Sequence, residues 1–233
     1  YDCDGVSSTT ILYKMLKRLG ANFSYHIPHR EDEGYGLNSN RIKILKEEGC
    51  ELILTCDNGI SGFLEVELAK ELGLDIIVTD HHDIPKIIDE EGNITEKFPE
   101  AHAVINPKRK DCSYPFKNLC GAGIAYKLAT CLYNEYKIEK EELKELLEIT
   151  AIATVCDVVD LIDENRIMVK EGLKLLNNTK NIGLQELFKV TGIFDKKIEE
   201  YHLGFVIGPC INATGRLETA SLSVDLLIET DKI

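Results

Sequence analysis

Two short apolar runs separated by a helix-like segment are the feature that most restricts the fold of this chain. "LILTC" at 52–56 and "DIIVT" at 75–79 are almost uniformly apolar rather than alternating. The "SGFLEVELAKELG" between them places leucines at i, i+4 and i+8 and ends in glycine. Uniformly apolar strands that alternate with helices indicate a parallel sheet covered on both faces. We therefore predict an α/β fold with a parallel β-sheet flanked by helices.

Other segments of the first half extend this pattern. Apolar residues at helical spacing predict helices at 6–20 and at 38–49, the second capped by Asn38 or Ser39. "NFSYHI" is β-prone, and "AVIN" at 103–106 predicts a further strand. The prolines between 84 and 116 indicate a loop-rich connection.

The second half has a different character. Four long segments after residue 117 have helical periodicity, whereas the stretch from His202 is expected to begin irregularly and end as a helix. We predict a single domain over 1–233, with a sheet-containing part at 1–116 and a helical part at 117–233.

Composition restricts location and ligands. The net charge of −13 disfavours non-specific binding of nucleic acid unless cations or a basic partner bridge to it. No apolar run is long enough for a membrane span, and no signal-peptide pattern is found in the sequence. The eight cysteines form no CxxC pair and are expected to be reduced thiols. These features predict a cytoplasmic protein with no membrane contact.

Charged side chains follow both apolar runs, at the point where each predicted strand ends. Asp57 comes directly after the first run, and Asp80, His81 and His82 follow the second. Because the carboxyl ends of parallel strands share one edge of a sheet, these groups are expected to lie together where ligands bind. "YDCDG" similarly suggests the end of a third strand, which would bring Asp2 and Asp4 to the same edge.

Asp157 is a further candidate because it follows an apolar stretch, "ITAIATVC", where an unpaired carboxylate is costly. Backbone N–H groups or Arg166 could satisfy it. Together with the strand-end acids, however, it suggests a shared site in which cations offset the repulsion between carboxylates. Aspartate and histidine ligands without thiolates favour two Mn²⁺ or Mg²⁺ ions, with iron as an alternative. Such a pair can activate a water and hold a phosphoryl group.

Successive segments of the chain resemble the motifs of the DHH phosphoesterases. They are "YDCDGVSS", "YHIPHREDEGYGLN", "LILTCDNGIS", "IIVTDHHD", "AVINPKR" with "CGAGIAYKLA", "ATVCDVVDLIDENR" and "IGPCINATGRLETASLSVDLL". The resemblance runs from Tyr1 to Asp231. Within this family, "IPHR…GYGLN" and "NATGR" are most similar to the RecJ-type single-stranded-DNA exonucleases.

The resemblance implies a hydrolase that degrades single-stranded DNA from 5′ to 3′ in recombination and repair. It implies a two-metal, activated-water mechanism with Mn²⁺ or Mg²⁺. Single-stranded DNA is the expected partner. A single-strand-binding protein and a helicase are further candidates, acting through regions outside this chain.

The resemblance also assigns roles to individual residues. The implied metal ligands are Asp2, Asp4, Asp57, His81 and Asp157, with Asp57 bridging both ions. The implied catalytic residues are Asp57, His82, which contacts the scissile phosphate, and Asp80, which orients a ring. The implied substrate-binding residues are Arg30, Arg216, His82 and Asn38, with Asn58 as a further wall residue. Tyr35, between two glycines, either stacks on a base or anchors its loop.

Three departures from the family pattern limit these expectations. The family's strand before "YD" is absent, Cys210 stands in "GPC" where "GPR" is common, and the DHH-associated and OB-type domains are missing. We therefore expect a catalytic core whose activity in isolation is weak. An oligoribonuclease or nucleotide phosphatase of the same family is an alternative. A non-catalytic RecJ-like adaptor is another, although the intact acids and histidines argue against it.

Overall fold

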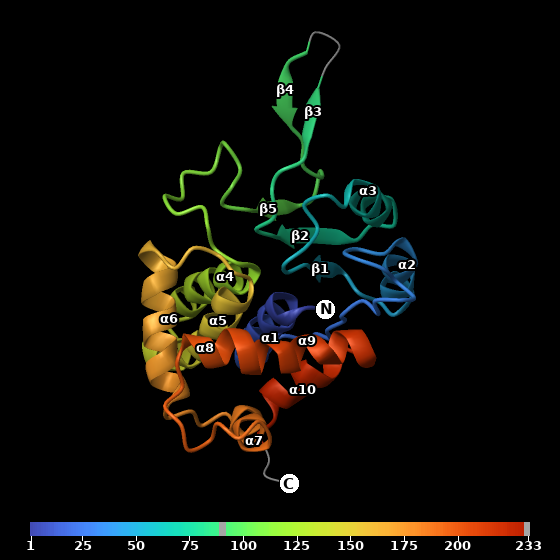
Figure 1. Ribbon diagram of the computed structural model, residues 1–233. Coiled ribbons are helices and arrows are strands. Elements are labelled where there is room, and N and C mark those ends of the chain that lie inside the picture. The colour runs from blue at the N-terminus through green and yellow to red at the C-terminus, as the bar shows by residue number, and fades with distance from the viewer. Residues whose placement is uncertain (89–91, 231–233) are drawn as a thin grey trace.

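A three-stranded parallel sheet forms the centre of the first half of the molecule (Figure 1). The computed structural model describes residues 1–88 and 92–230. Strands β1 (Leu52–Leu54), β2 (Asp75–Thr79) and β5 (Ala103–Ile105) pair in the order β1-β2-β5. Leu54 is opposite Ile77, and Thr79 is opposite Ile105. These strands coincide with "LILTC", "DIIVT" and "AVIN", so the predicted parallel sheet is confirmed.

Helices cover both faces of this sheet. Helices α2 (Ser39–Glu47) and α3 (Phe63–Glu71) pack on one face, where they share an apolar core with β2. Helices α1 (Cys3–Arg18) and α4 (Gly121–Glu135) lie on the other side (Figure 1). Leu54 and Cys56 pack against the core to which α1 and α4 belong. The strands are largely apolar, as predicted, because helices cover both faces of the sheet, although Leu52 of β1 and Ile105 of β5 stay exposed.

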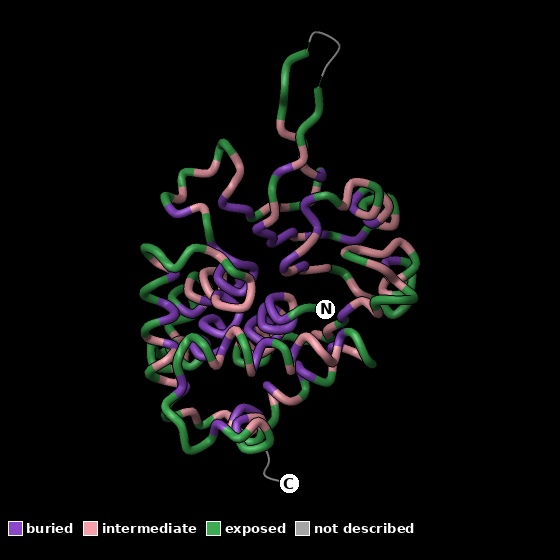
Figure 2. The backbone as a smooth tube through the Cα atoms, viewed as in Figure 1, coloured by how far each residue is buried: buried purple, intermediate pink, exposed green. Residues whose placement is uncertain are grey.

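The second half is helical. It contains α5 (Lys140–Cys156), α6 (Asp163–Leu176), α7 (Ile182–Val190), α8 (Glu200–His202), α9 (Gly208–Leu217) and α10 (Ser221–Ile228). Figure 2 shows the buried backbone concentrated where α1, α4 and α5 meet. Helix α1, from the N-terminus of the chain, also packs against α9 and α10, and so belongs to both halves.

Two connections differ from the sequence-based expectations. "NFSYHI" forms no strand in the described structure. The loop-rich segment contains an antiparallel hairpin, β3 (Lys86–Ile88) with β4 (Ile94–Glu96), that projects from the molecule (Figure 1). Its strands are only three residues long, too short for an apolar–polar alternation to be recognised.

The stretch from His202 is helical rather than irregular. Helix α8 continues through a π-helical segment, Leu203–Ile207, into α9. Pro209 does not interrupt this helix, because it lies just after the π-helical segment, where the backbone hydrogen-bond pattern changes. A Cβ on Gly208 would lie 2.4 Å from Cys156 Sγ, so glycine is required there for close packing against α5 rather than to interrupt a helix.

Candidate metal centre

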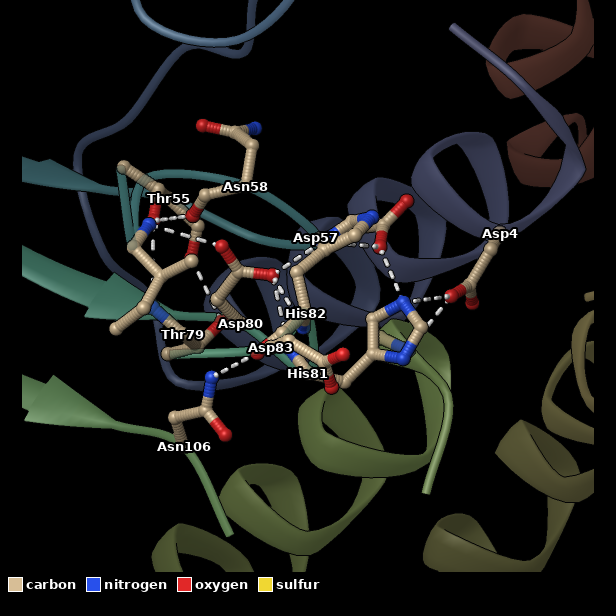
Figure 3. Close-up of polar contacts among 12 residues, drawn as sticks. Asp4, Thr55, Asp57, Asn58, Thr79, Asp80, His81, His82, Asp83 and Asn106 are labelled. Atoms are coloured by element: carbon tan, nitrogen blue, oxygen red, sulfur yellow. Dashed lines mark hydrogen bonds and ion pairs between the residues drawn. The ribbon is translucent and has the colours of Figure 1, made fainter. Parts of the chain in front are cut away.

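The ends of β1 and β2 are fixed to one another by two threonines. Thr79 Oγ1 donates a 2.7 Å hydrogen bond to the carbonyl of Thr55, and the Thr79 N–H donates to Thr55 Oγ1 at 3.2 Å. Asp57 then turns away with φ +58°, a left-handed conformation that aspartate tolerates better than most residues. The strand-end acids predicted from the sequence therefore do meet at one edge of the sheet (Figure 3).

Asp80 organises the turn that carries the two histidines. Its carboxylate accepts hydrogen bonds from the N–H groups of Ile60 (2.9 Å), His81 (2.8 Å) and His82 (3.1 Å) and lies 2.7 Å from His82 Nδ1. Burial opposes ionisation of Asp80, but these hydrogen bonds outweigh it and lower its pKa. The hydrogen bond between the Asp80 carboxylate and the His82 ring raises the pKa of His82 to about 9. Asp80 is therefore occupied in orienting His82, as the resemblance implies.

Asp4 faces the beginning of α4. Its carboxylate is 2% exposed and accepts hydrogen bonds from the N–H groups of Gly121 (2.6 Å) and Ala122 (2.8 Å). These donors are otherwise unpaired at a helix N-terminus, which favours a negative charge. They fix Asp4 at the edge of the sheet, although α1 and α4 are far apart in the sequence.

Three carboxylates converge on the imidazole of His81. Its Nε2 lies 3.0 Å from Asp57 Oδ1 and 3.5 Å from Asp4 Oδ2, while its Nδ1 lies 3.8 Å from Asp157 Oδ2 (Figure 3 shows the first two). His82 Nδ1 lies 4.0 Å from Asp57 Oδ1. Possible ligand atoms form two groups that share His81: one with Asp57 and His82, the other with Asp4 and Asp157.

The charges of this cluster are not balanced by the protein. Burial raises the pKa of Asp57 to about 8, assisted by Asp2, and that of Asp4 to about 7, assisted by Asp57. In the described part of the chain, no lysine or arginine forms an ion pair with Asp4, Asp57 or Asp157.

Two further observations favour divalent cations. Asp57 Oδ1 is buried and has no hydrogen-bond partner of acceptable geometry. Asp157 caps the C-terminal end of α5, where the helix dipole disfavours an anion, and burial raises its pKa to about 6. A cation would resolve both costs. Oxygen and imidazole donors suit Mn²⁺ or Mg²⁺, so Asp4, Asp57, His81 and Asp157 fit such ions, with His82 as an alternative ligand.

The remaining predicted residues lie around this cluster. Asp2 is the N-cap of α1 and accepts from the Gly5 N–H at 3.0 Å, and it belongs to neither ligand group. It lines a small hollow together with Tyr1, Pro28, Tyr35, Asp57 and Asn58. The Tyr35 hydroxyl is 3.2 Å from His82 Nε2.

The substrate-binding candidates are more dispersed. The Arg30 guanidinium lies 5.5 Å from the ring of Tyr1, at the hollow, and Arg216 is exposed on α9. Asn38 is the N-cap of α2; its amide oxygen accepts from two backbone N–H groups and its amide nitrogen donates to the Glu33 carbonyl. Its predicted capping role is confirmed, whereas its contact with substrate stays a prediction.

Three supporting residues were not singled out from the sequence. Asn212 Oδ1 accepts from the Cys3 N–H at 2.7 Å, and a Cβ on Gly215 would lie 2.3 Å from the carbonyl of Tyr1. Both hold "NATGR" against the start of α1. A Cβ on Gly121 would lie 2.7 Å from Asp57 Cβ. All three lie within the segments that carry the family resemblance, which was the available signal.

Residues 1–154 match the model of the DHH family, N-terminal domain. The chain belongs to the DHH family. Among its curated DHH relatives, the single-stranded-DNA-specific exonuclease RecJ of Bacillus subtilis is 42% identical over 99% of this chain. RecJ of Escherichia coli is 37% identical over 98% of it. The chain spans 27% and 40% of the lengths of these two proteins, respectively.

Solved DHH structures have the same fold. A crystal structure of exonuclease RecJ bound to manganese superimposes with a TM-score of 0.83 at 33% identity, covering 98% of this chain and 54% of the other. RecJ from Thermus thermophilus in complex with Mn²⁺ gives 0.79 at 30% identity, covering 99% and 31%. The predicted resemblance and fold class are confirmed. None of the helices in the described residues has the length and apolar character needed to span a bilayer.

Proposed function

We propose that this DHH chain is the catalytic core of a metal-dependent exonuclease that hydrolyses single-stranded DNA from the 5′ end, in recombination and repair. The observation that carries the proposal is the convergence of Asp4, Asp57 and Asp157 on His81, with too little positive charge to balance them. The RecJ names of relatives that align with nearly the whole chain support the substrate. The proposal includes a cytoplasmic location, supported by eight cysteines that are all free.

In this proposal Asp4, Asp57, His81 and Asp157 hold two Mn²⁺ or Mg²⁺ ions. Bound there, the ions would lower the pKa of water and stabilise negative charge on the phosphoryl oxygens. Asp2 lies beside them as a further candidate ligand. The α4 N-terminus keeps Asp4 oriented, and the left-handed turn after β1 keeps Asp57 at the sheet edge.

The side chains that surround the cluster would position the DNA. Asp80 accepts from His82 Nδ1, which leaves Nε2 beside the Tyr35 hydroxyl, where the imidazolium can donate to a non-bridging phosphate oxygen. Arg30, which lies over the ring of Tyr1, and Arg216 would bind substrate phosphate. Contacts with a single-strand-binding protein or a helicase remain predictions for regions outside this chain.

Hydrolysis of labelled oligonucleotides tests the proposal. We expect the chain to release mononucleotides from single-stranded DNA with Mn²⁺, to lose activity in EDTA, and to cut duplex DNA poorly. Nuclease-resistant linkages placed at either the 5′ or the 3′ end of the substrate identify the direction of digestion. Asp57→Asn is the matched inactive control, because asparagine is nearly isosteric and tolerates a positive φ. Cleavage of dinucleotides alone would instead indicate an oligoribonuclease-like enzyme, and metal binding without any hydrolysis would contradict the proposal.

A further inference from the structure

A second and larger hollow borders the metal cluster on the side of His81. It has a volume of about 220 Å³, and its lining includes His81, Lys108, Asn118, Leu119, Val158 and Asp160. The hollow beside Tyr35 and Asp57 shares none of these residues. Two separate recesses therefore border the candidate centre, one lined by Asp57 and the other by His81. An enzyme that cuts a phosphodiester must accommodate a nucleotide on each side of the cleaved bond.

Lys108 has a fixed backbone position relative to the histidines. Asn106 is 2% exposed, and its amide nitrogen donates to the His82 carbonyl at 2.9 Å. Its amide oxygen accepts from the Lys108 N–H at 2.9 Å. A single buried side chain thus bridges the turn that carries His81 and His82 to the base of Lys108, with Pro107 restricting the intervening backbone.

The Lys108 ammonium can exchange its present partner for a phosphate. It pairs at 2.9 Å with Asp83, whose side chain is 93% exposed, whereas the lysine side chain is 32% exposed. An ion pair with such an exposed carboxylate contributes little stability. Asp160, the acid that lines the hollow, lies 3.4 Å from the Asn118 amide nitrogen. Lys108 is therefore the cationic group that this recess offers to an anion.

Apolar side chains contribute part of the wall. Leu119 is buried, and Val158 is 87% exposed with φ +58°. A β-branched residue in this conformation is strained, and such strain persists where the surrounding structure imposes it. Val158 directly follows Asp157. The strained turn therefore places the candidate ligand Asp157 at the metal cluster and the apolar side chain of Val158 at the rim of the hollow. A cation beside apolar surface suits a nucleotide, which has an anionic phosphate and a base or sugar face.

We propose that the hollow between His81 and Lys108 binds the nucleotide across the cleaved bond from the Tyr35 side, with Lys108 Nζ contacting its phosphate. The inference rests on the proposed nuclease function. It adds a second subsite to it, with a lysine that binds substrate rather than a metal. Asp83 then competes with the DNA phosphate for the Lys108 ammonium. Replacing Lys108 should therefore weaken DNA binding, whereas replacing Asp83 should not.

DNA binding tests the subsite. The ligand is a 3′-fluorescein oligothymidylate of roughly 12 nucleotides, and fluorescence anisotropy measures its affinity with Ca²⁺ at several salt concentrations. Lys108→Gln is expected to weaken binding about tenfold and to reduce the salt slope by about 0.7, the value for one phosphate contact on a single strand. Lys110→Gln is the matched control, an exposed lysine two positions away that does not line the hollow. Asp83→Asn and Asp160→Asn should leave binding unchanged or strengthen it.

Replacing single phosphates of the oligonucleotide with neutral methylphosphonates locates the contact. We expect the effect of Lys108→Gln to disappear for the ligand that lacks the contacted phosphate. Equal weakening by Lys108→Gln and Asp83→Asn would show a purely structural ion pair and overturn the subsite, as would equal effects of Lys108→Gln and Lys110→Gln. Failure of the unchanged chain to bind or cut single-stranded DNA would instead refute the proposed function itself.

Discussion

Replacing Gly121 with alanine should push the Asp57 carboxylate out of the metal cluster. The new Cβ would lie 2.7 Å from Asp57 Cβ and 2.9 Å from both Cγ and Oδ1, whereas ordinary contact begins at 3.4 Å. One side must therefore move by 0.5 to 0.7 Å (3.4 − 2.9 and 3.4 − 2.7). Gly121 is held by its hydrogen bond to Asp4, so Asp57 is expected to yield.

A displacement of this size is large for a metal site, because ligand geometry must be kept within about 0.5 Å. Disturbing the supports of a ligand typically lowers metal affinity about 10- to 100-fold, and we expect a loss in this range for Mn²⁺. The added methyl group should also lower the free energy of unfolding of the metal-free chain by about 1 to 3 kcal/mol.

Gly5→Ala is the matched control, because Gly5 approaches Asp57 from another helix. Its Cβ would lie 3.4 Å from Asp57 Oδ2 and 3.6 Å from Asp2 Oδ1, which are ordinary contacts. Helix propensity should stabilise this variant by up to about 1 kcal/mol. For both variants, calorimetric titration with Mn²⁺ measures the metal affinity, and urea unfolding in EDTA measures the free energy of unfolding of the metal-free chain. Wild-type affinity and stoichiometry in a folded Gly121→Ala chain would refute the argument that Gly121 positions Asp57.

Other expectations follow from the same cluster. Asp4 and Asp57 have pKa values of about 7 and about 8 in the folded chain, above the value of 3.8 expected when exposed, so the folded state binds more protons than the unfolded state between these limits. The free energy of unfolding of the metal-free chain should therefore fall as the pH rises from 4 to 8, by up to about 1.4 kcal/mol per pH unit for each group. Bound Mn²⁺ should reverse this trend. Urea unfolding at several pH values measures it, and a free energy of unfolding that rises with pH in EDTA would contradict the prediction. Asp57→Asn should stabilise the metal-free chain at pH 8 by at least about 1 kcal/mol while weakening Mn²⁺ binding. Destabilisation by this substitution in EDTA would show that burial and neighbouring acids do not disfavour the charged carboxylate. Asn212→Ala leaves the Cys3 N–H without its acceptor and should lower the free energy of unfolding by about 1 to 2 kcal/mol. If urea unfolding measures no change, Asn212 does not hold α1 in place.

The sheet and its ligand-bearing edge were predictable because both depend on local patterns. Uniformly apolar runs indicated buried strands, and the polarity change at Asp57 and Asp80 marked where those strands end. The family motif implied that Asp80 orients a ring; its hydrogen bonds are made with His82, and its catalytic role stays a prediction.

The supports of the site could not be derived in this way, because they depend on packing between segments distant in the sequence. Nothing near Gly121 indicates that Asp57 will lie against it, and Asn212 is separated from Cys3 by most of the chain. The helical course of the stretch from His202 was not predicted, because local propensity does not record that Gly208 must approach Cys156 closely. The division at residue 116, the separate roles of the two histidines and the contacts of Arg30 and Arg216 with DNA stay predictions.

The attachment of Asp4 to the beginning of α4 makes the centre depend on how the molecule is assembled. Asp57 and His81 are carried by the sheet, whereas Asp4 and Asp157 are carried by helices that pack beneath it. The group that contains Asp4 and Asp157 is complete only when these helices lie against the sheet, because it shares His81. In a chain whose helices had formed but had not yet docked on the sheet, this second group of ligands would be missing, so the complete centre exists only after the two parts of the fold have assembled.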